Sequence, residues 1–335
     1  MELSIVTTLY RSAPYLEGFY RRMSAAAGQI TADYEIIFVN DGSPDSSLEM
    51  ALALYEQDEK VRVADLSRNF GHHKAMMTGL ARARGDLVFL IDCDLEVDPE
   101  VLAAFFARFR ESGVDVVYGV QETRQDRLVD RAFGRLFYTL FNRLSDDPLP
   151  HNLVTTRLMS RRYVSALVQH REREVLIGGL WVITGFEQAP IVVHKANKGS
   201  STYNLGRKVT IIVNAITSFS NKPLLFIFYL GCIILFLASI AAADLIVQRL
   251  FFGVLLAGWP SLIVSVWLLG GLTIFCLGVI GIYLSRIFIE TKHRPYTIIR
   301  QMYERQTETG HALHGYSENG QSVLFREGDN TRPDG

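Results

Sequence analysis

Cysteine is scarce in this 335-residue chain, which has only Cys93, Cys232 and Cys276. Three cysteines placed in this way form no disulfide framework, so the sequence favours a reducing compartment. The chain also lacks an excess of one charge, because 34 basic and 35 acidic residues give a formal net charge of -1. No nucleic-acid partner is expected from this balance. No cleavable signal is expected either, since the N-terminus lacks a basic segment and its apolar run, residues 3–9, is too short.

Long apolar runs are missing from the first 222 residues and dominate the next part of the chain. Residues 224–288 are apolar almost throughout, with breaks near Asp244, Gln248 and Arg249 and at Pro260. Within them, residues 224–247 and 261–288 are each long enough to cross a hydrocarbon core, which needs about 20 apolar residues. We therefore predict a transmembrane hairpin of two helices. The alternative is a pair of buried core helices in a soluble protein.

Basic residues flank this hairpin at its outer ends, whereas the connection between the helices carries only Arg249. They are Arg207, Lys208 and Lys222 before the first span, and Arg286, Lys292, Arg294 and Arg300 after the second. Basic residues accumulate on the cytosolic side of membrane segments. The N-terminal domain and both termini are therefore expected in the cytosol, in a multi-pass protein of the cell membrane.

The first hundred residues alternate strand and helix patterns. Strands are predicted at residues 3–9, 35–39, 61–66 and 87–91, and helices at residues 14–27, 48–57 and 73–83. Strict alternation is typical of an α/β domain whose sheet is mostly parallel and Rossmann-like. Because parallel strands end at one edge of the sheet, Asp41, Asp65 and Asp92 are expected to line one cleft.

An acidic motif, Asp92-Cys93-Asp94-Leu95-Glu96, follows the apolar strand 87–91 directly. Acids on alternate positions at the carboxyl end of a strand can hold a divalent cation against a phosphorylated ligand. An isolated Asp-x-Asp motif is more often a solvated strand end, so the rest of the chain has to decide between the two interpretations.

Further motifs follow in a fixed order. They are VNDGS at 39–43, LSRNFG at 66–71, the acidic motif with Asp98-Pro99-Glu100, TRLM at 156–159, SFSNKPL at 218–224 and RPYTI at 294–298. Together with the apolar hairpin, this order resembles the metal-dependent, inverting family 2 glycosyltransferases with the GT-A fold. Within them it resembles the polyprenyl-phosphate (undecaprenyl or dolichyl phosphate) sugar transferases related to dolichyl-phosphate mannose synthase. The resemblance covers roughly residues 3–304.

The resemblance implies three groups of site residues. The nucleotide would be contacted by Thr8, Tyr10, Asp41, Ser67, Asn69 and Asp92. Mg²⁺ or Mn²⁺ would be held on the donor diphosphate by Asp92, Asp94 and Glu96, where a hard cation neutralises charge on the departing nucleotide. Asp94, Arg124 and Arg157 would be catalytic, and the acceptor phosphate would be contacted by Arg124, Arg157, Lys198, Ser201, Tyr203 and Lys208. Guanidinium groups suit phosphate contacts.

The chain departs from the family pattern in two places. Thr8, Arg11 and Ser12 stand where Pro, Asn and Glu are usual, and Glu96 stands where Gln is common, so the base, uracil or guanine, stays open. Thr155 stands where many bacterial relatives have a carboxylate that has been regarded as a base. A phosphate monoester with a second pKa of about 6 is already largely dianionic at neutral pH, so its attack needs positioning and charge compensation more than a base.

Three other features have two interpretations each. Residues 118–144 predict an amphipathic helix with a basic side that includes Arg124, which either packs on the domain or lies near lipid headgroups. The segment HKANKGSSTY, residues 194–203, with Lys195 and Lys198, is either a second phosphate clamp or a basic surface loop. His72, His73 and His151 lack the spacing of metal ligands, so they are interpreted as polar or packing residues.

The predicted order of domains is a GT-A domain (1–205), a juxtamembrane amphipathic helix (206–223), two transmembrane helices (224–288), a cytosolic juxtamembrane segment (289–306) and a disordered tail (307–335). The expected function is inverting transfer of a sugar from a nucleotide sugar to a membrane polyprenyl phosphate, for a cell-surface glycan or glycoprotein. A homo-oligomer is compatible with it. One alternative is a polysaccharide synthase, although the Gln-x-x-Arg-Trp motif of those enzymes is absent. The other is a non-catalytic, membrane-anchored nucleotide-binding scaffold, which the presence of Asp41, Asp92, Asp94 and Arg157 disfavours.

Overall fold

The structure, a computed structural model, describes residues 1–121, 152–170, 172, 177–195, 222–252, 258–305, 314–316 and 322–324. The chain divides into two units, Met1–Tyr303 and Glu304–Gly335. Of the predicted site residues, Arg124, Lys198, Ser201, Tyr203 and Lys208 lie outside the described residues, as do His151, most of the predicted helix 118–144 and the predicted helix 206–223 up to residue 221. Residues 118–120 of the former belong to a strand.

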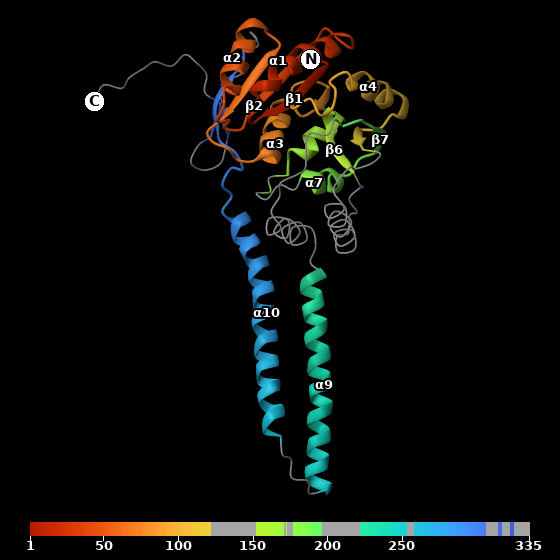
Figure 1. The fold of residues 1–335 in the computed structure, drawn as a ribbon, viewed down its shortest axis with the longest axis vertical. Coiled ribbons are helices and arrows are strands. Elements are labelled where there is room, and N and C mark those ends of the chain that lie inside the picture. The colour runs from red at the N-terminus through yellow and green to blue at the C-terminus, as the bar shows by residue number, and fades with distance from the viewer. Residues whose placement is uncertain are drawn as a thin grey trace, which may run out of the picture. The chain divides into compact units, whose positions relative to one another are not determined.

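An eight-stranded sheet organises the first unit (Figure 1). Its strand order is β7-β5-β6-β4-β1-β2-β3-β8. The strands are β1 Leu3–Leu9, β2 Tyr34–Asn40, β3 Val61–Leu66, β4 Leu87–Leu90, β5 Val116–Val120, β6 Leu153–Ser160, β7 Gln188–Val192 and β8 Ile299–Tyr303. The strands β3, β2, β1 and β4 are parallel neighbours, while β6 and β8 run antiparallel to β4 and β3. The predicted α/β class with a mostly parallel sheet is therefore confirmed.

Helices cover both faces of this sheet, which explains why its central strands are apolar without alternation. The helices are α1 Ala13–Gly28, α2 Ser47–Gln57, α3 His72–Arg82, α4 Val101–Ser112, α6 Arg161–Leu167 and α7 Ile177–Ile183. Phe19 of α1 and Phe105 of α4 pack with Ile5 in one core cluster. Met76 of α3 and Leu180 of α7 pack with the next residue of β1, Val6, in the other. Successive residues of a strand point to opposite faces, so β1 contributes to both cores.

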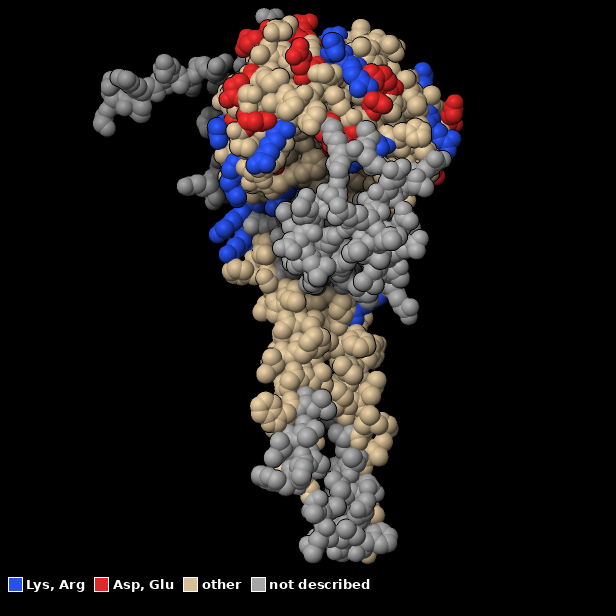
Figure 2. All heavy atoms as spheres, viewed as in Figure 1, with Lys and Arg blue, Asp and Glu red and all other residues tan. Residues whose placement is uncertain are grey.

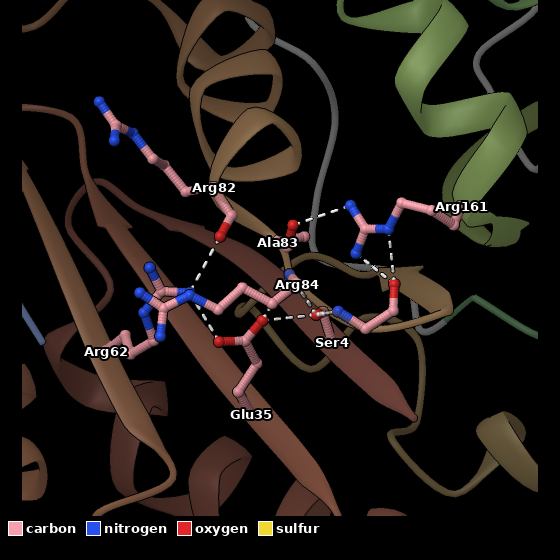
Figure 3. A network of polar contacts seen from close by, with 8 residues as sticks. Ser4, Glu35, Arg62, Arg82, Ala83, Arg84 and Arg161 are labelled. Atoms are coloured by element: carbon pink, nitrogen blue, oxygen red, sulfur yellow. Dashed lines mark hydrogen bonds and ion pairs between the residues drawn. The ribbon is translucent and has the colours of Figure 1, made fainter. Parts of the chain in front are cut away.

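A buried polar network fixes the amino-terminal edge of the sheet, away from the predicted site (Figure 3). Glu35 accepts hydrogen bonds from the Ser4 hydroxyl at 2.6 Å and from the Arg84 backbone at 2.7 Å. Its second oxygen pairs with Arg62 at 2.6 Å, and both side chains are less than a tenth exposed. Arg161 donates to the carbonyl oxygens of Ala83 and Gly85. These contacts hold the turn between α3 and β4, and so set where β4 begins.

Strand β8 is the main addition to the predicted domain. The sequence predicted residues 289–306 only as a juxtamembrane segment, yet Ile299–Tyr303 forms the edge strand beside β3. It follows helix α10, Trp259–Thr291, after a linker of residues 292–298. The α/β unit thus continues beyond residue 205, because its last strand comes from the far side of the apolar region.

Two long apolar helices occupy the region predicted to be a hairpin, α9 Lys222–Phe252 and α10. Their described parts display few charged side chains in Figure 2, and large apolar side chains such as Phe236 and Trp267 are exposed. Within the part of the chain that is described, one stretch, Ser265–Thr291, is long and apolar enough to cross a membrane, and Lys222–Ile234 is a shorter apolar helix. The two-span membrane hairpin therefore stays a prediction.

The second unit contains two short antiparallel strands, β9 His314–Tyr316 and β10 Ser322–Leu324. Both strands lie within residues 307–335, which the sequence predicted to be a disordered tail.

Candidate active site

The acidic motif lies in a tight turn directly after β4. Leu95 adopts a left-handed backbone with φ of 59°, and the Asp94 carboxylate accepts a hydrogen bond from the Glu96 backbone at 3.0 Å. Leu95 itself packs against the core, so the turn is anchored and the acids on either side are half-buried. Burial, and with it the charges of Glu96 and Asp92, raises the pKa of Asp94. A bound cation would reduce the electrostatic repulsion between these carboxylates.

Asp92 is held by His72, a residue that the sequence analysis interpreted as polar or packing. The His72 Nε2 atom lies 3.3 Å from the Asp92 carboxylate, and its Nδ1 atom lies 2.9 Å from the Thr8 hydroxyl. Burial opposes ionisation of Asp92, but hydrogen bonds from His72 and Thr155 outweigh it and lower the pKa of Asp92. His72 therefore links the ends of β1 and β4 and keeps the Asp92 carboxylate ionised.

Of the three acids in the turn, Glu96 forms an ion pair of its own with a basic residue. Its carboxylate pairs with the Lys195 ammonium at 2.6 Å. Among the described residues, no three His, Cys, Asp or Glu side chains come close enough together to hold a metal ion. Asp92 and Asp94 do supply hard oxygen ligands. Mg²⁺ is commonly held by one or two carboxylates, with phosphate oxygens of the substrate and water completing its shell, so these two residues fit such an ion.

The loops after β2 and β3 are fastened to each other. Asp41 is buried, and its carboxylate accepts hydrogen bonds from the backbone of Phe70 at 2.7 Å and of Gly71 at 3.0 Å. Burial raises the pKa of Asp41, and these two hydrogen bonds act against that rise. Gly42 has a φ of 59°, and a Cβ there would lie 2.4 Å from the Asn69 backbone nitrogen. Only glycine therefore permits this contact between the loops.

The acids predicted to line one cleft do lie at the same edge of the sheet, since β2, β3, β1 and β4 pair in parallel. Their side chains differ in access, however. Asp41 and Asp65 are buried and hydrogen-bonded, whereas Asp92 is half-buried. Of the other residues predicted to contact the nucleotide, Tyr10 and Asn69 are exposed, Ser67 is half-buried and Thr8 is almost buried.

Arg157 lies in β6, opposite Leu90 of β4, and it is 1% exposed. Its guanidinium stacks on the Trp181 ring, with 3.1 Å between the guanidinium carbon and the ring centroid. Its Nε and Nη1 atoms are buried without a hydrogen-bond partner. Burial lowers the pKa of Arg157 to about 9. A cation this poorly compensated is costly to bury, which favours a role with an anion over one in packing alone.

We expect Arg157→Met to reduce transfer on the order of a hundredfold or more, as for the loss of one preorganised charge, while the protein stays folded. Methionine replaces a buried cation with an apolar group of similar length, so stability is expected to hold or rise. The comparison is Thr155→Ala, which removes one hydrogen bond to Asp92 and is expected to keep most activity. Steady-state rates on folded, lipid-bound protein test this. Wild-type rates in Arg157→Met would show that the arginine only packs, and an equally deep loss in Thr155→Ala would assign that hydroxyl an essential role.

Sequence reasoning missed His72 and one further residue, Arg300 of β8. The signal for His72 was its place at the first turn of the helix after LSRNFG, where a side chain can reach the ends of neighbouring strands. For Arg300 there was no local signal, because its contacts, Asp65 and Ser67, are distant in sequence.

A cavity of about 700 Å³ lies between α3 and the linker that follows α10, and neither Asp92 nor Asp94 lines it. Its lining is mixed in polarity and includes Thr78, Arg82, Val168, Glu290, Arg294 and Tyr296. The acidic turn is not part of it.

Comparisons with known proteins bear on the family to which the chain belongs. The model of glycosyl transferase family 2 matches residues 4–168, which include all but the first residue of β1, the strands β2 to β6 and the acidic turn. A glycosyltransferase-named protein of Mycobacterium tuberculosis (strain CDC 1551 / Oshkosh) is 58% identical over 304 residues, covering 90% of this chain and 89% of that protein. The bactoprenol glucosyl transferase of Shigella phage SfV is 32% identical over 303 residues, covering 90% of this chain and 98% of that protein.

Among solved structures, a crystal structure of S. aureus TarS 1-349 in complex with UDP-GlcNAc aligns with 65% of this chain and 66% of that chain, at 17% identity and a TM-score of 0.45. So distant a likeness says nothing about function. The sequence relatives decide the class: this protein is a glycosyltransferase. It belongs to glycosyl transferase family 2.

Proposed function

We propose that this glycosyltransferase moves a sugar from a nucleotide sugar to a polyprenyl phosphate in a membrane, with inversion at the anomeric carbon. The observation that carries the proposal is the extent of the match to the phage bactoprenol glucosyl transferase, which takes in 90% of this chain. A match of that extent reaches beyond the α/β unit into the apolar helices. Relatives that share only the catalytic sheet would leave the acceptor open.

The acidic turn supports the donor half of the reaction. Asp92 and Asp94 would hold Mg²⁺ or Mn²⁺ on the donor diphosphate, where the ion supplies charge compensation for the departing nucleoside diphosphate. His72 keeps Asp92 oriented and ionised.

For the acceptor half of the reaction, we propose that the protein supplies positive charge to the polyprenyl phosphate rather than a catalytic base. A phosphate monoester reaches the site largely dianionic, so the protein has to bring two anionic substrates together. Arg157 contributes a buried guanidinium group whose Nε and Nη1 atoms have no hydrogen-bond partner. Arg124, Lys198, Ser201, Tyr203 and Lys208 remain proposed contacts of the acceptor phosphate.

We propose that the apolar helices α9 and α10 present the lipid, and that the protein lies in the cell membrane with both termini in the cytosol. Labelling of single cysteines tests this arrangement, in a chain whose Cys232 and Cys276 are replaced by serine. A membrane-impermeant reagent added from outside should label Arg249→Cys and leave Lys292→Cys unlabelled. Labelling of Lys292→Cys from outside would overturn the topology.

The transfer itself is tested by incubating membranes with a panel of radiolabelled UDP- and GDP-sugars. We expect one label to become lipid-soluble and to be released by mild acid, which cleaves a sugar from its lipid phosphate. Membranes with the Asp94→Asn variant are the control for other transferases. If the label instead enters a long polysaccharide and no lipid intermediate forms, the protein is a polysaccharide synthase.

A further inference from the structure

The pairing of β8 with β3 is interrupted by a β-bulge close to the predicted nucleotide-binding loops. Its register with β3 shifts between Asp65 and Leu66, because Asp65 pairs with Gln301 while Leu66 pairs with Ile299. Arg300 is the additional residue at this bulge. A bulge turns a side chain out of the regular alternation of a strand, and such bulges are frequent next to active sites.

The Arg300 guanidinium uses this freedom to contact two groups at the carboxyl end of β3. Its Nη2 donates to the Ser67 carbonyl oxygen at 2.8 Å, and its Nη1 lies 3.4 Å from the Asp65 carboxylate. The Ser67 backbone in turn donates to the Ile298 carbonyl oxygen at 2.9 Å. The first residue after β3 is therefore fastened through both its backbone N–H and its carbonyl oxygen to residues 298–300.

Asp65 extends this contact to the neighbouring loop. Its side chain is 3% exposed, and its other oxygen accepts a hydrogen bond from the Asn40 amide at 2.8 Å. The Asn40 oxygen accepts from the Ser43 backbone at 3.2 Å. A continuous path of polar contacts thus leads from Arg300 through Asp65 and Asn40 to the loop after β2, the same loop that Asp41 ties to Phe70 and Gly71.

We propose that Arg300 is a positioning residue for binding of the nucleoside diphosphate. From β8, the strand that follows α10, Arg300 holds the loops after β2 and β3 in the conformation that binds the nucleotide. This inference rests on the proposed function. Arg300 is mostly exposed, so its surface ion pair contributes little to stability. Its effect falls on two loops rather than on the core, because both of its acceptors lie where β3 ends.

The position of Arg300 has a consequence for the membrane part. The Thr297 hydroxyl lies 2.8 Å from the Thr78 hydroxyl of α3, and Tyr296 packs against the core beside α3. The linker from α10 is therefore attached to the α/β unit just before β8 begins. A chain that ended before α9 would lose both this attachment and the Arg300 contacts, so it is expected to bind nucleotide poorly.

The experiment compares three full-length variants in detergent or nanodiscs, with UDP and GDP as probes. Arg300→Ala should weaken binding of the preferred nucleotide about tenfold, the size expected for losing a hydrogen bond to a charged group. The donor KM should rise with it, while the acceptor KM and the thermal unfolding temperature stay near wild type. Arg300→Lys, which keeps the charge without the fork, should be intermediate. Gln301→Ala, on the exposed side of the same strand, is the matched control and should leave nucleotide binding unchanged.

Two outcomes would overturn the inference while leaving the proposed function intact. One is wild-type nucleotide affinity in Arg300→Ala. The other is a loss of affinity that Gln301→Ala reproduces, or that accompanies an equal loss of thermal stability, since either would mark a general defect of the edge strand. If the wild-type chain itself bound neither UDP nor GDP and transferred no sugar, the proposed function would fail first.

Discussion

Replacing Asp94 with asparagine is expected to abolish detectable sugar transfer, a loss on the order of a hundredfold or more, because a cation supplies several kcal/mol at such a site. Asparagine has the same shape, and its oxygen can still accept the hydrogen bond from the Glu96 backbone, so the turn should keep its conformation. Only the charge is lost. Rates with excess Mg²⁺ or Mn²⁺ measure the effect, and EDTA added to the wild type should mimic it.

Asp98→Asn is the matched control for this experiment. Asp98 lies four positions further on, is well exposed and pairs with Arg22 at the surface at 2.6 Å. Its substitution should leave the rate within about twofold, because exposed ion pairs contribute little. Turnover near the wild-type level in folded Asp94→Asn, with metal present, would show that the metal assignment is wrong.

The second large effect is a loss of folding stability, expected from a substitution of Glu35 at the amino-terminal edge of the sheet. Removal of the Glu35 carboxylate in Glu35→Ala leaves the buried Arg62 guanidinium without its counter-charge and takes an acceptor from Ser4 and from the Arg84 backbone. Breaking a buried ion pair in this way costs about 3–5 kcal/mol. We expect a marked fall in the unfolding temperature of the full chain in detergent, measured by circular dichroism.

Two variants show whether the cost comes from the unpaired charge. Glu17→Ala, at an exposed position of α1, should change stability by no more than about 0.5 kcal/mol. The double variant Glu35→Met with Arg62→Met removes both charges, so it should lose less than Glu35→Ala alone. Unchanged stability in Glu35→Ala would contradict the account of the network in Figure 3.

The parts of the fold that the sequence predicted are those that local pattern determines. Strands β1 and β3 begin and end where they were predicted, because each is a short stretch rich in aliphatic and β-branched residues that is buried along its whole length. Helix α3 begins at His72 rather than at residue 73, a difference of one position. Strand β8 was missed, because IRQMY is only partly buried and gains its structure from β3, which is distant in sequence.

The sequence was enough to predict where the candidate site lies, but only some of the contacts that its residues make. The acidic turn, the order of the strands along the chain and the parallel pairing follow from sequence, so Asp92 and Asp94 could be placed at one edge. Which partner each acid takes depends on side chains brought together by folding. For this reason the bonds of Asp41 to the Phe70 backbone, of Asp92 to His72 and of Glu96 to Lys195 could not be foreseen.

The edge position of β8 also sets an order of events during synthesis. Arg300 lies 233 positions after Ser67, and both apolar helices are made between them. Until β8 has left the ribosome, the outer edge of β3 has no neighbour, and an unpaired edge invites association with other chains. The sheet is therefore completed only after α9 and α10 have been translated. A nascent chain arrested between the two helices would therefore expose the outer edge of β3.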